Sequence, residues 1–93
     1  MKDKKRFHIV VSGRVQGVGF RYFAVQKAND CNLKGWVKNL PDGQVELEAE
    51  GDGKDLAAFI DYLKLGNGYS RTDRLSQSEI STLENYPDFN VRY

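Results

Sequence analysis

The sequence predicts an α+β fold in which one antiparallel sheet carries two helices packed on a single face. Apolar residues alternate with polar ones over residues 7–12 and 44–50, which is typical of half-buried strands. Residues 20–28 and 56–63 instead repeat apolar side chains at the spacing of a helix face. The resulting order, strand, helix, strand, strand, helix, strand and a short terminal strand, usually folds into a two-layer sandwich.

The first strand is expected to place Phe7, Ile9 and Val11 on one face and to end at Gly13. The chain before it is basic, through Lys2, Lys4, Lys5 and Arg6. No apolar segment follows these residues, which excludes a secretory signal peptide. We therefore expect them to form a short frayed tail.

The first helix should begin near Phe20, with its buried face formed by Phe20, Phe23, Ala24 and Ala28. It should end within residues 29–32, where short polar side chains compete with the helical backbone. A second strand is expected over residues 34–39. The turn that follows is predicted at Pro41-Asp42-Gly43, because proline presets φ and glycine accepts the left-handed conformation.

The third strand has the clearest alternation, with Val45, Leu47 and Ala49 on the buried face. Its other face is acidic, through Glu46, Glu48 and Glu50. We interpret this acidic row as a solvated face and not as a metal site.

The second helix should be capped by Asp52 and ended by Gly66. Its apolar face comprises Leu56, Phe59, Ile60 and Leu63. Residues 67–73 are expected to be a loop, and a weakly alternating fourth strand should lie within residues 75–83. Phe89, Val91 and Tyr93 form the expected final strand. This arrangement is a ferredoxin-like sandwich, a fold that hosts many unrelated functions.

Composition restricts the broad class of the protein. The 93 residues are expected to form a single domain, 1–93, with one modest core. Fourteen Lys and Arg against thirteen Asp and Glu give a net charge of +1, which points to neither nucleic acid nor membrane. No apolar run is long enough to span a bilayer. The lone Cys31 excludes an internal disulfide and fits a reducing compartment. We expect a soluble, cytoplasmic monomer.

The glycine-rich segment at residues 13–21, Gly-Arg-Val-Gln-Gly-Val-Gly-Phe-Arg, indicates an anion site. Its glycines allow positive φ and bring several backbone N–H groups together. The helix that follows adds unpaired N–H groups and a partial positive charge. Arg21 stands at this helix start, where a cation is unfavourable unless an anion binds. Together these features favour a phosphate ligand.

Several other kinds of site are excluded. A Walker loop would need Gly-Lys-Ser/Thr where Gly19-Phe20-Arg21 stands, and a dinucleotide fingerprint would need glycine in place of Tyr22. We interpret His8, within a strand, as structural or exposed. Cys31 falls late in a helix and far from the glycines, so a thiolate nucleophile is not expected. Neither a metal nor an organic cofactor is implied.

Asn39, at the end of the second strand, is the candidate partner of the anion site. Its amide offers a donor and an acceptor, which can hold a water molecule by two hydrogen bonds. It would approach Arg21 if the first two strands share a sheet. The alternative is that Asn39 merely begins the turn after it, and the sequence leaves both open.

These two segments resemble the two signatures of the acylphosphatase family. Residues 13–21 resemble the first, and Gly35-Trp36-Val37-Lys38-Asn39, running into Asp42-Gly43, resembles the second. The resemblance covers nearly the whole chain and is loosest over residues 67–84. It implies metal-independent hydrolysis of a small-molecule acyl phosphate to a carboxylate and inorganic phosphate.

The resemblance also implies roles for individual residues. Arg21 would bind the phosphoryl group, and Asn39 would orient the attacking water. The backbone N–H groups that would bind with Arg21 are those of Val15, Gln16, Gly17, Val18, Gly19 and Phe20. This fits phosphoryl transfer, which depends on positioning and charge stabilisation. The carboxylate leaving group needs little protonation, because the pKa of its conjugate acid is about 4 to 5.

Two alternatives come from other classes of protein. An RNA-binding domain has the same element order, and Phe20-Arg21-Tyr22-Phe23 superficially resembles a stacking platform. Phe20 and Phe23 fall on the expected buried face, however, and a charge of +1 attracts a polyanion weakly. The second alternative is a phosphate-sensing domain, or a module serving a larger partner, as in hydrogenase-maturation carbamoyltransferases. The presence of both Arg21 and Asn39 favours a free-standing hydrolase.

Overall fold

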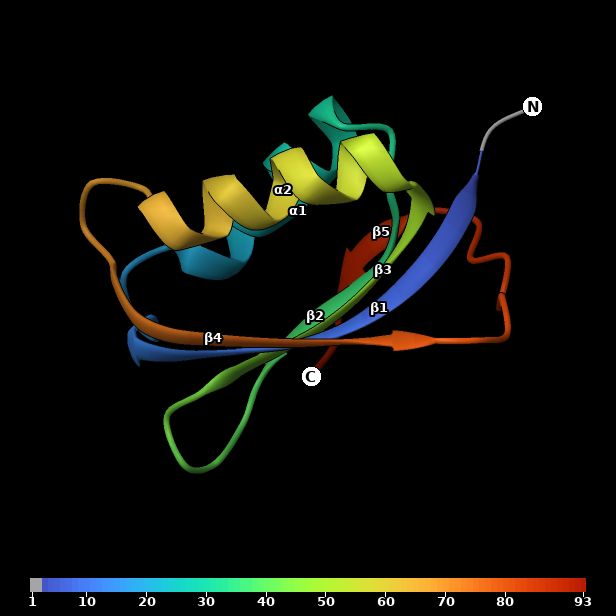
Figure 1. The fold of residues 1–93 in the computed structure, drawn as a ribbon. Coiled ribbons are helices and arrows are strands. Elements are labelled where there is room, and N and C mark those ends of the chain that lie inside the picture. Colours follow the sequence, from blue (N-terminus) through green and yellow to red (C-terminus); the bar gives the residue numbers. More distant parts are fainter. Residues whose placement is uncertain (1–2) are drawn as a thin grey trace.

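The computed structural model describes residues 3–93 as two layers, with both helices on one face of a five-stranded sheet (Figure 1). The elements are β1 (Lys4–Arg14), α1 (Phe20–Asp30), β2 (Lys34–Asn39), β3 (Val45–Asp52), α2 (Gly53–Leu65), β4 (Arg71–Ile80) and β5 (Phe89–Val91). The strand order across the sheet is β4-β1-β3-β2-β5. The predicted α+β sandwich is confirmed.

The prediction of a wholly antiparallel sheet is wrong at one edge. β1 pairs antiparallel with β3 and β4, and β2 pairs antiparallel with β3, but β5 pairs parallel with β2. The reason lies in the segment 81–88. β4 ends at the end of the sheet where β2 begins, and the segment crosses that end, so β5 starts beside the start of β2. The sheet is therefore mixed.

The basic residues near the N-terminus are not a frayed tail. Lys4, Lys5 and Arg6 belong to β1 and pair with residues 50–52 of β3. Arg6 Nε donates to Glu48 Oε1 at 2.8 Å, and the Arg6 side chain is only 11% exposed. Lys2 lies outside the described residues. The tail prediction fails because the pairing strand lies more than forty residues away in sequence.

β4 also begins earlier than predicted. Arg71 and Thr72, assigned to a loop over residues 67–73, pair with Arg14 and Gly13 at the end of β1. This pairing passes through an irregularity between Ser12 and Gly13. The local sequence does not predict a strand at Arg71 and Thr72, but β1 supplies backbone hydrogen-bond partners there and extends β4.

The helices bury the faces that the sequence predicts, with one exception. Phe20, Ala24 and Ala28 of α1 are buried, whereas Phe23 is only partly so. Leu56, Phe59, Ile60 and Leu63 of α2 are buried. Asp52 caps α2 as expected, because its Oδ1 accepts from the N–H of Lys54 at 3.0 Å, and Gly66 ends the helix. The apolar periodicity was therefore sufficient to predict the core.

The acidic row of β3 is not a solvated face. Glu46 lies 2.7 Å from His8 Nε2 and 3.6 Å from Lys38 Nζ, and Glu48 pairs with Arg6. Glu50 is 1% exposed and its carboxylate accepts from the backbone N–H groups of Glu84 and Tyr86. Glu50 is buried and Glu46 and Glu48 are partly buried, and all three have charged or N–H partners that offset the loss of water. Glu48 and Glu50 hold the segment 81–88 against the sheet through Glu84 and Tyr86.

Gly35 gives a prediction for stability. A Cβ at this position would overlap the backbone oxygen of Glu48 in the neighbouring strand. We expect Gly35→Ala to lower the free energy of unfolding by at least about 2 kcal/mol, because β2 and β3 must separate to admit the methyl group. Urea denaturation measures this change.

Gly43→Ala is the matched control. Gly43 also has a positive φ, 95°, but no atom lies within 4 Å of a Cβ built there. Its loss should be confined to about 1 kcal/mol of backbone strain. Equal losses in the two variants would contradict the steric explanation for Gly35.

Candidate active site

Four segments meet at one end of the molecule (Figure 1). They are the glycine loop (residues 15–19), the β2–β3 turn (residues 40–44), the α2–β4 link (residues 66–70) and the chain end after β5. β1 and β2 both run antiparallel to β3, so both end here, and β4 begins here beside Arg14. The first two strands thus share a sheet, with β3 between them.

The glycine loop presents free N–H groups. Gly17 and Gly19 are left-handed, with φ of 74° and 76°, and Gly19 caps α1 without any side-chain hydrogen bond. No acidic residue occupies the first turn of α1. Within residues 3–93, none of the N–H groups of residues 15–20 donates to another protein group. A concave row of free donors at a helix start suits an anion.

Side chains hold the loop on two sides. Gln16 Nε2 donates to the carbonyl oxygens of Leu40 and Gln44, both at 2.8 Å. On the other side, Asn67 Nδ2 donates to the carbonyl oxygen of Val18 at 2.8 Å. Val15 is buried in the core. The loop is therefore positioned before any ligand arrives, which reduces the entropy lost on binding.

Asn67 is a site residue that sequence reasoning missed. Its Oδ1 accepts from the N–H groups of Tyr69 and Ser70, at 2.9 and 2.8 Å, while its amide nitrogen bonds the glycine loop. An asparagine directly after a helix-ending glycine is a signal for such a turn. Its contact with Val18, 49 residues earlier, leaves no trace in the local sequence.

Arg21 lies beside a hollow of about 270 Å³ between the glycine loop and β5. The hollow is lined by Val15, Gly17, Gly19, Phe20, Arg21, Tyr22, Val25, Asn90, Val91 and Tyr93. The Arg21 Cζ atom is 5.4 Å from the centre of the Tyr93 ring, a cation–π distance. Within the described chain, no carboxylate lies within 4 Å of the guanidinium nitrogens. The charge of Arg21 is therefore available to a ligand.

Asn39 lies at the end of β2, paired with Val45, and does not line this hollow. Its Oδ1 is buried and accepts no hydrogen bond from residues 3–93. An unpaired buried acceptor costs about 1–3 kcal/mol, so its burial calls for an explanation.

The β2–β3 turn does not depend on Asn39. Asp42 Oδ1 accepts from the N–H of Gln44 at 3.0 Å, and Asp42 Oδ2 accepts from the Gln44 side chain at 2.6 Å. These bonds to the backbone and side chain of Gln44 lower the pKa of Asp42. The turn is organised by Asp42, which weakens the interpretation of Asn39 as a turn-initiating residue.

Other reactive side chains lie apart from the loop. His8 is engaged with Glu46 on the sheet, and Cys31 lies at the far end of α1. Burial raises the pKa of the Cys31 thiol, and the nearby carboxylates of Asp55 and Asp30 act in the same direction. A raised pKa disfavours the reactive thiolate. Residues 3–93 contain no group of three His, Cys, Asp or Glu side chains placed to hold a metal ion.

A loop of free N–H groups with an unneutralised arginine beside it suits an anion such as phosphate. Comparison with known proteins identifies the family. The acylphosphatase family model matches residues 7–91, and the chain belongs to the acylphosphatase family. The resemblance seen in the two signature segments is confirmed, and the chain is an enzyme of that family.

The similarity extends over almost the entire chain. The acylphosphatase of Bacillus subtilis is 43% identical over 95% of this chain and 97% of its own length, and that of Methylococcus capsulatus is 42% identical over 94% and 95%. The crystal structure of the Bacillus subtilis acylphosphatase superposes with a TM-score of 0.93 and covers 96% of this chain. The T. kodakarensis HypF structure contains the same fold (TM-score 0.84, 39% identity), with 96% of this chain matching 12% of that one.

The described helices include none that is both long and apolar enough to cross a membrane.

Proposed function

We propose that this chain, as a single domain over residues 1–93, hydrolyses small-molecule acyl phosphates by in-line attack of water. Arg21 and the N–H groups of residues 15–20 hold the phosphoryl group, and Asn39 orients the water. The observation that carries the proposal is the buried, unpartnered Oδ1 of Asn39 at the same end of the sheet as the unneutralised Arg21. Within residues 3–93, Arg21 has no carboxylate partner and Asn39 Oδ1 accepts no hydrogen bond. A phosphoryl group would pair with Arg21, and an attacking water would donate to Asn39.

The reaction needs no covalent intermediate. The water oxygen forms a bond to phosphorus while the bond between phosphorus and the acyl oxygen breaks, and the electron pair leaves with the carboxylate. The water proton passes to an oxygen of the phosphoryl group itself. Free loop N–H groups and the Arg21 fork stabilise the charge on the phosphoryl oxygens. No protein base is required. The titratable side chains that line the Arg21 hollow are Arg21, Tyr22 and Tyr93, and none of them is a carboxylate or a histidine.

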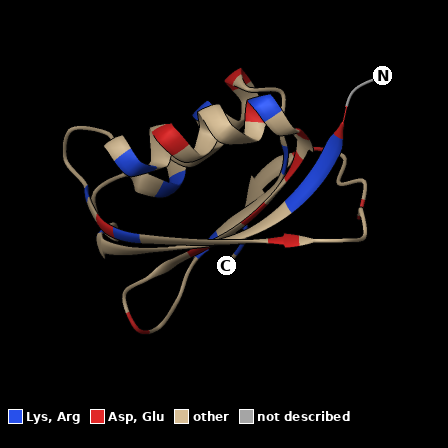
Figure 2. Cartoon of the chain, in the orientation of Figure 1, with Lys and Arg blue, Asp and Glu red and all other residues tan. Residues whose placement is uncertain are grey.

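The proposal assigns the reaction to a cytoplasmic monomer that works without cofactor and without nucleic acid. The Phe20 ring is 1% exposed, so it is unable to stack on a base. Basic and acidic residues are interspersed along the visible elements (Figure 2), consistent with the net charge of +1. Both features support a small-molecule substrate over a polyanion.

Hydrolysis of benzoyl phosphate in excess EDTA tests the proposal. We expect turnover at about 1–1000 s⁻¹, the usual range for enzymes, with the same rate after chelation and after addition of Mg²⁺. Circular dichroism on the same sample verifies the fold. A folded protein without turnover would leave a phosphate-sensing domain as the better interpretation, and a rate that depends on metal would refute the metal-free mechanism.

A further inference from the structure

A second hollow lies beside Gly19 and Tyr22, and Arg21 is not part of its lining. It has a volume of about 580 Å³ and lies between α1 and the α2–β4 link. Its lining includes Gly19, Tyr22, Phe23, Lys27, Asn67 and Tyr69. Gly19 and Tyr22 line both hollows, so the second is adjacent to the proposed phosphate site.

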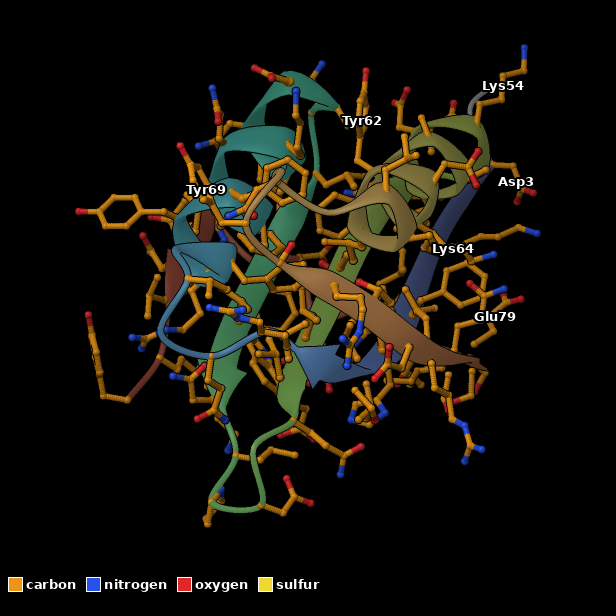
Figure 3. All side chains as sticks on the ribbon, turned by 90° about the vertical axis from the view of Figure 1, so that its left-hand side faces the viewer. Asp3, Lys54, Tyr62, Lys64, Tyr69 and Glu79 are labelled. Atoms are coloured by element: carbon orange, nitrogen blue, oxygen red, sulfur yellow. The ribbon has the colours of Figure 1, made fainter. Side chains whose placement is uncertain are left out.

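Two exposed tyrosines flank this second hollow. Tyr22 is 85% exposed and Tyr69 is 79% exposed, so neither ring contributes to the core. Figure 3 shows Tyr69 beside α1, whereas Lys64 lies on the opposite side of α2. Tyr69 is held in place through Asn67, which accepts the N–H of Tyr69 and donates to Val18 in the glycine loop. The backbone of Tyr69 is thus tied to the glycine loop through one residue.

The second hollow and Asn39 lie on opposite sides of the glycine loop. Gln16 joins the loop to the turn that follows Asn39, and Val18 joins it to the link that carries Tyr69. Figure 1 shows that turn and that link on opposite sides of the loop. In-line displacement requires the leaving group to depart opposite the attacking water. A water at Asn39 therefore places the acyl group on the side of Tyr69.

We infer that the second hollow binds the acyl portion of the substrate and that Tyr22 and Tyr69 favour aromatic acyl phosphates over acetyl phosphate. This rests on the proposed function. Aromatic rings attract one another in offset or edge-to-face contact, and the methyl group of acetyl phosphate is unable to make such a contact. Lys27, the basic residue of this hollow, is engaged with the Tyr62 ring at 4.5 Å and with Asp30 at 3.9 Å. The hollow therefore suits an uncharged acyl group.

The test compares kcat/KM for benzoyl phosphate and acetyl phosphate in the wild type, Tyr22→Ala and Tyr69→Ala. We expect kcat/KM for benzoyl phosphate to fall about three- to tenfold in both variants, the range that aromatic pairs give. Tyr69 lines the second hollow and not the Arg21 hollow, so Tyr69→Ala should leave kcat/KM for acetyl phosphate unchanged. Tyr69→Phe should keep the preference, because the ring is retained. Leu83→Ala is the control, since Leu83 is an exposed apolar side chain outside both hollows.

The outcomes separate this inference from the proposed function. Inhibition by inorganic phosphate reports the phosphate site alone and should be the same in the wild type and in Tyr69→Ala. If the wild type hydrolyses both substrates but Tyr69→Ala loses activity equally on both, or loses none, the acyl site is refuted and the proposed function stands. If the wild type hydrolyses neither substrate, both are refuted.

Discussion

Replacing Arg21 by alanine is expected to lower kcat/KM for acyl phosphate hydrolysis by about 10³-fold or more, the scale on which arginines act in phosphoryl transfer. The guanidinium lines the hollow beside the glycine loop and has no carboxylate within 4 Å in the described chain. Its contact with the phosphoryl group would exist in both the ground state and the transition state. Steady-state kinetics should therefore show a raised KM together with a lowered kcat.

Stability distinguishes this role from a structural one. A cation in the first turn of α1 is unfavourable, and relieving this offsets the loss of the Arg21–Tyr93 cation–π contact, so Arg21→Ala should change the free energy of unfolding by less than about 1 kcal/mol. Arg21→Lys should not restore activity, because an ammonium group lacks the planar fork. Arg74→Ala, an exposed arginine of β4, is the matched control and should remain fully active. Near wild-type turnover in Arg21→Ala would overturn the proposed phosphate clamp.

Replacing Asn39 by alanine is expected to lower kcat by about 10²–10³-fold, as loss of one positioned hydrogen-bonding group does in other active sites. KM and the inhibition constant of inorganic phosphate should change little, because Arg21 and the glycine loop are untouched. The Oδ1 atom has no hydrogen-bond partner in residues 3–93, so its removal breaks no hydrogen bond at that atom. Chemical denaturation should accordingly show stability that is retained or slightly raised.

Asp42→Ala separates this role from a role in the turn. Asp42 supplies the side-chain hydrogen bonds of the β2–β3 turn through its contacts with Gln44. Its loss should weaken the turn without a selective fall in kcat. If Asn39→Ala instead resembles Asp42→Ala, with lower stability and normal kcat, Asn39 belongs to the turn and the assignment of the water-orienting role is wrong.

The sequence determined the elements that depend on near neighbours. Apolar spacing predicted both helix faces, and Asp52 and Gly66 predicted the two ends of α2, because caps and amphipathic faces act within a few residues. The same holds for the glycine loop and Arg21. Their order along the chain already places free N–H groups and a cation at one helix start.

Only the tertiary structure decided which polar side chains of the sheet have hydrogen-bonding or charged partners. The local sequence predicts a solvated face for the acidic row of β3. In the structure, the backbone N–H groups of residues 84 and 86 donate to Glu50, and Arg6 pairs with Glu48. The direction of β5 likewise depends on where the segment 81–88 crosses the sheet. Such pairs are separated by more than thirty residues, and local periodicity carries no information about them.

The same division holds at the active site. Two signature segments were sufficient to identify Arg21 and Asn39 as candidates, whereas the contact of Asn67 with Val18 and the hollow beside Tyr69 arise only when the α2–β4 link folds against the glycine loop. A residue's type and local spacing determine the chemistry it can perform. The packing of distant elements brings other residues beside it, and these residues determine which substrate the site binds.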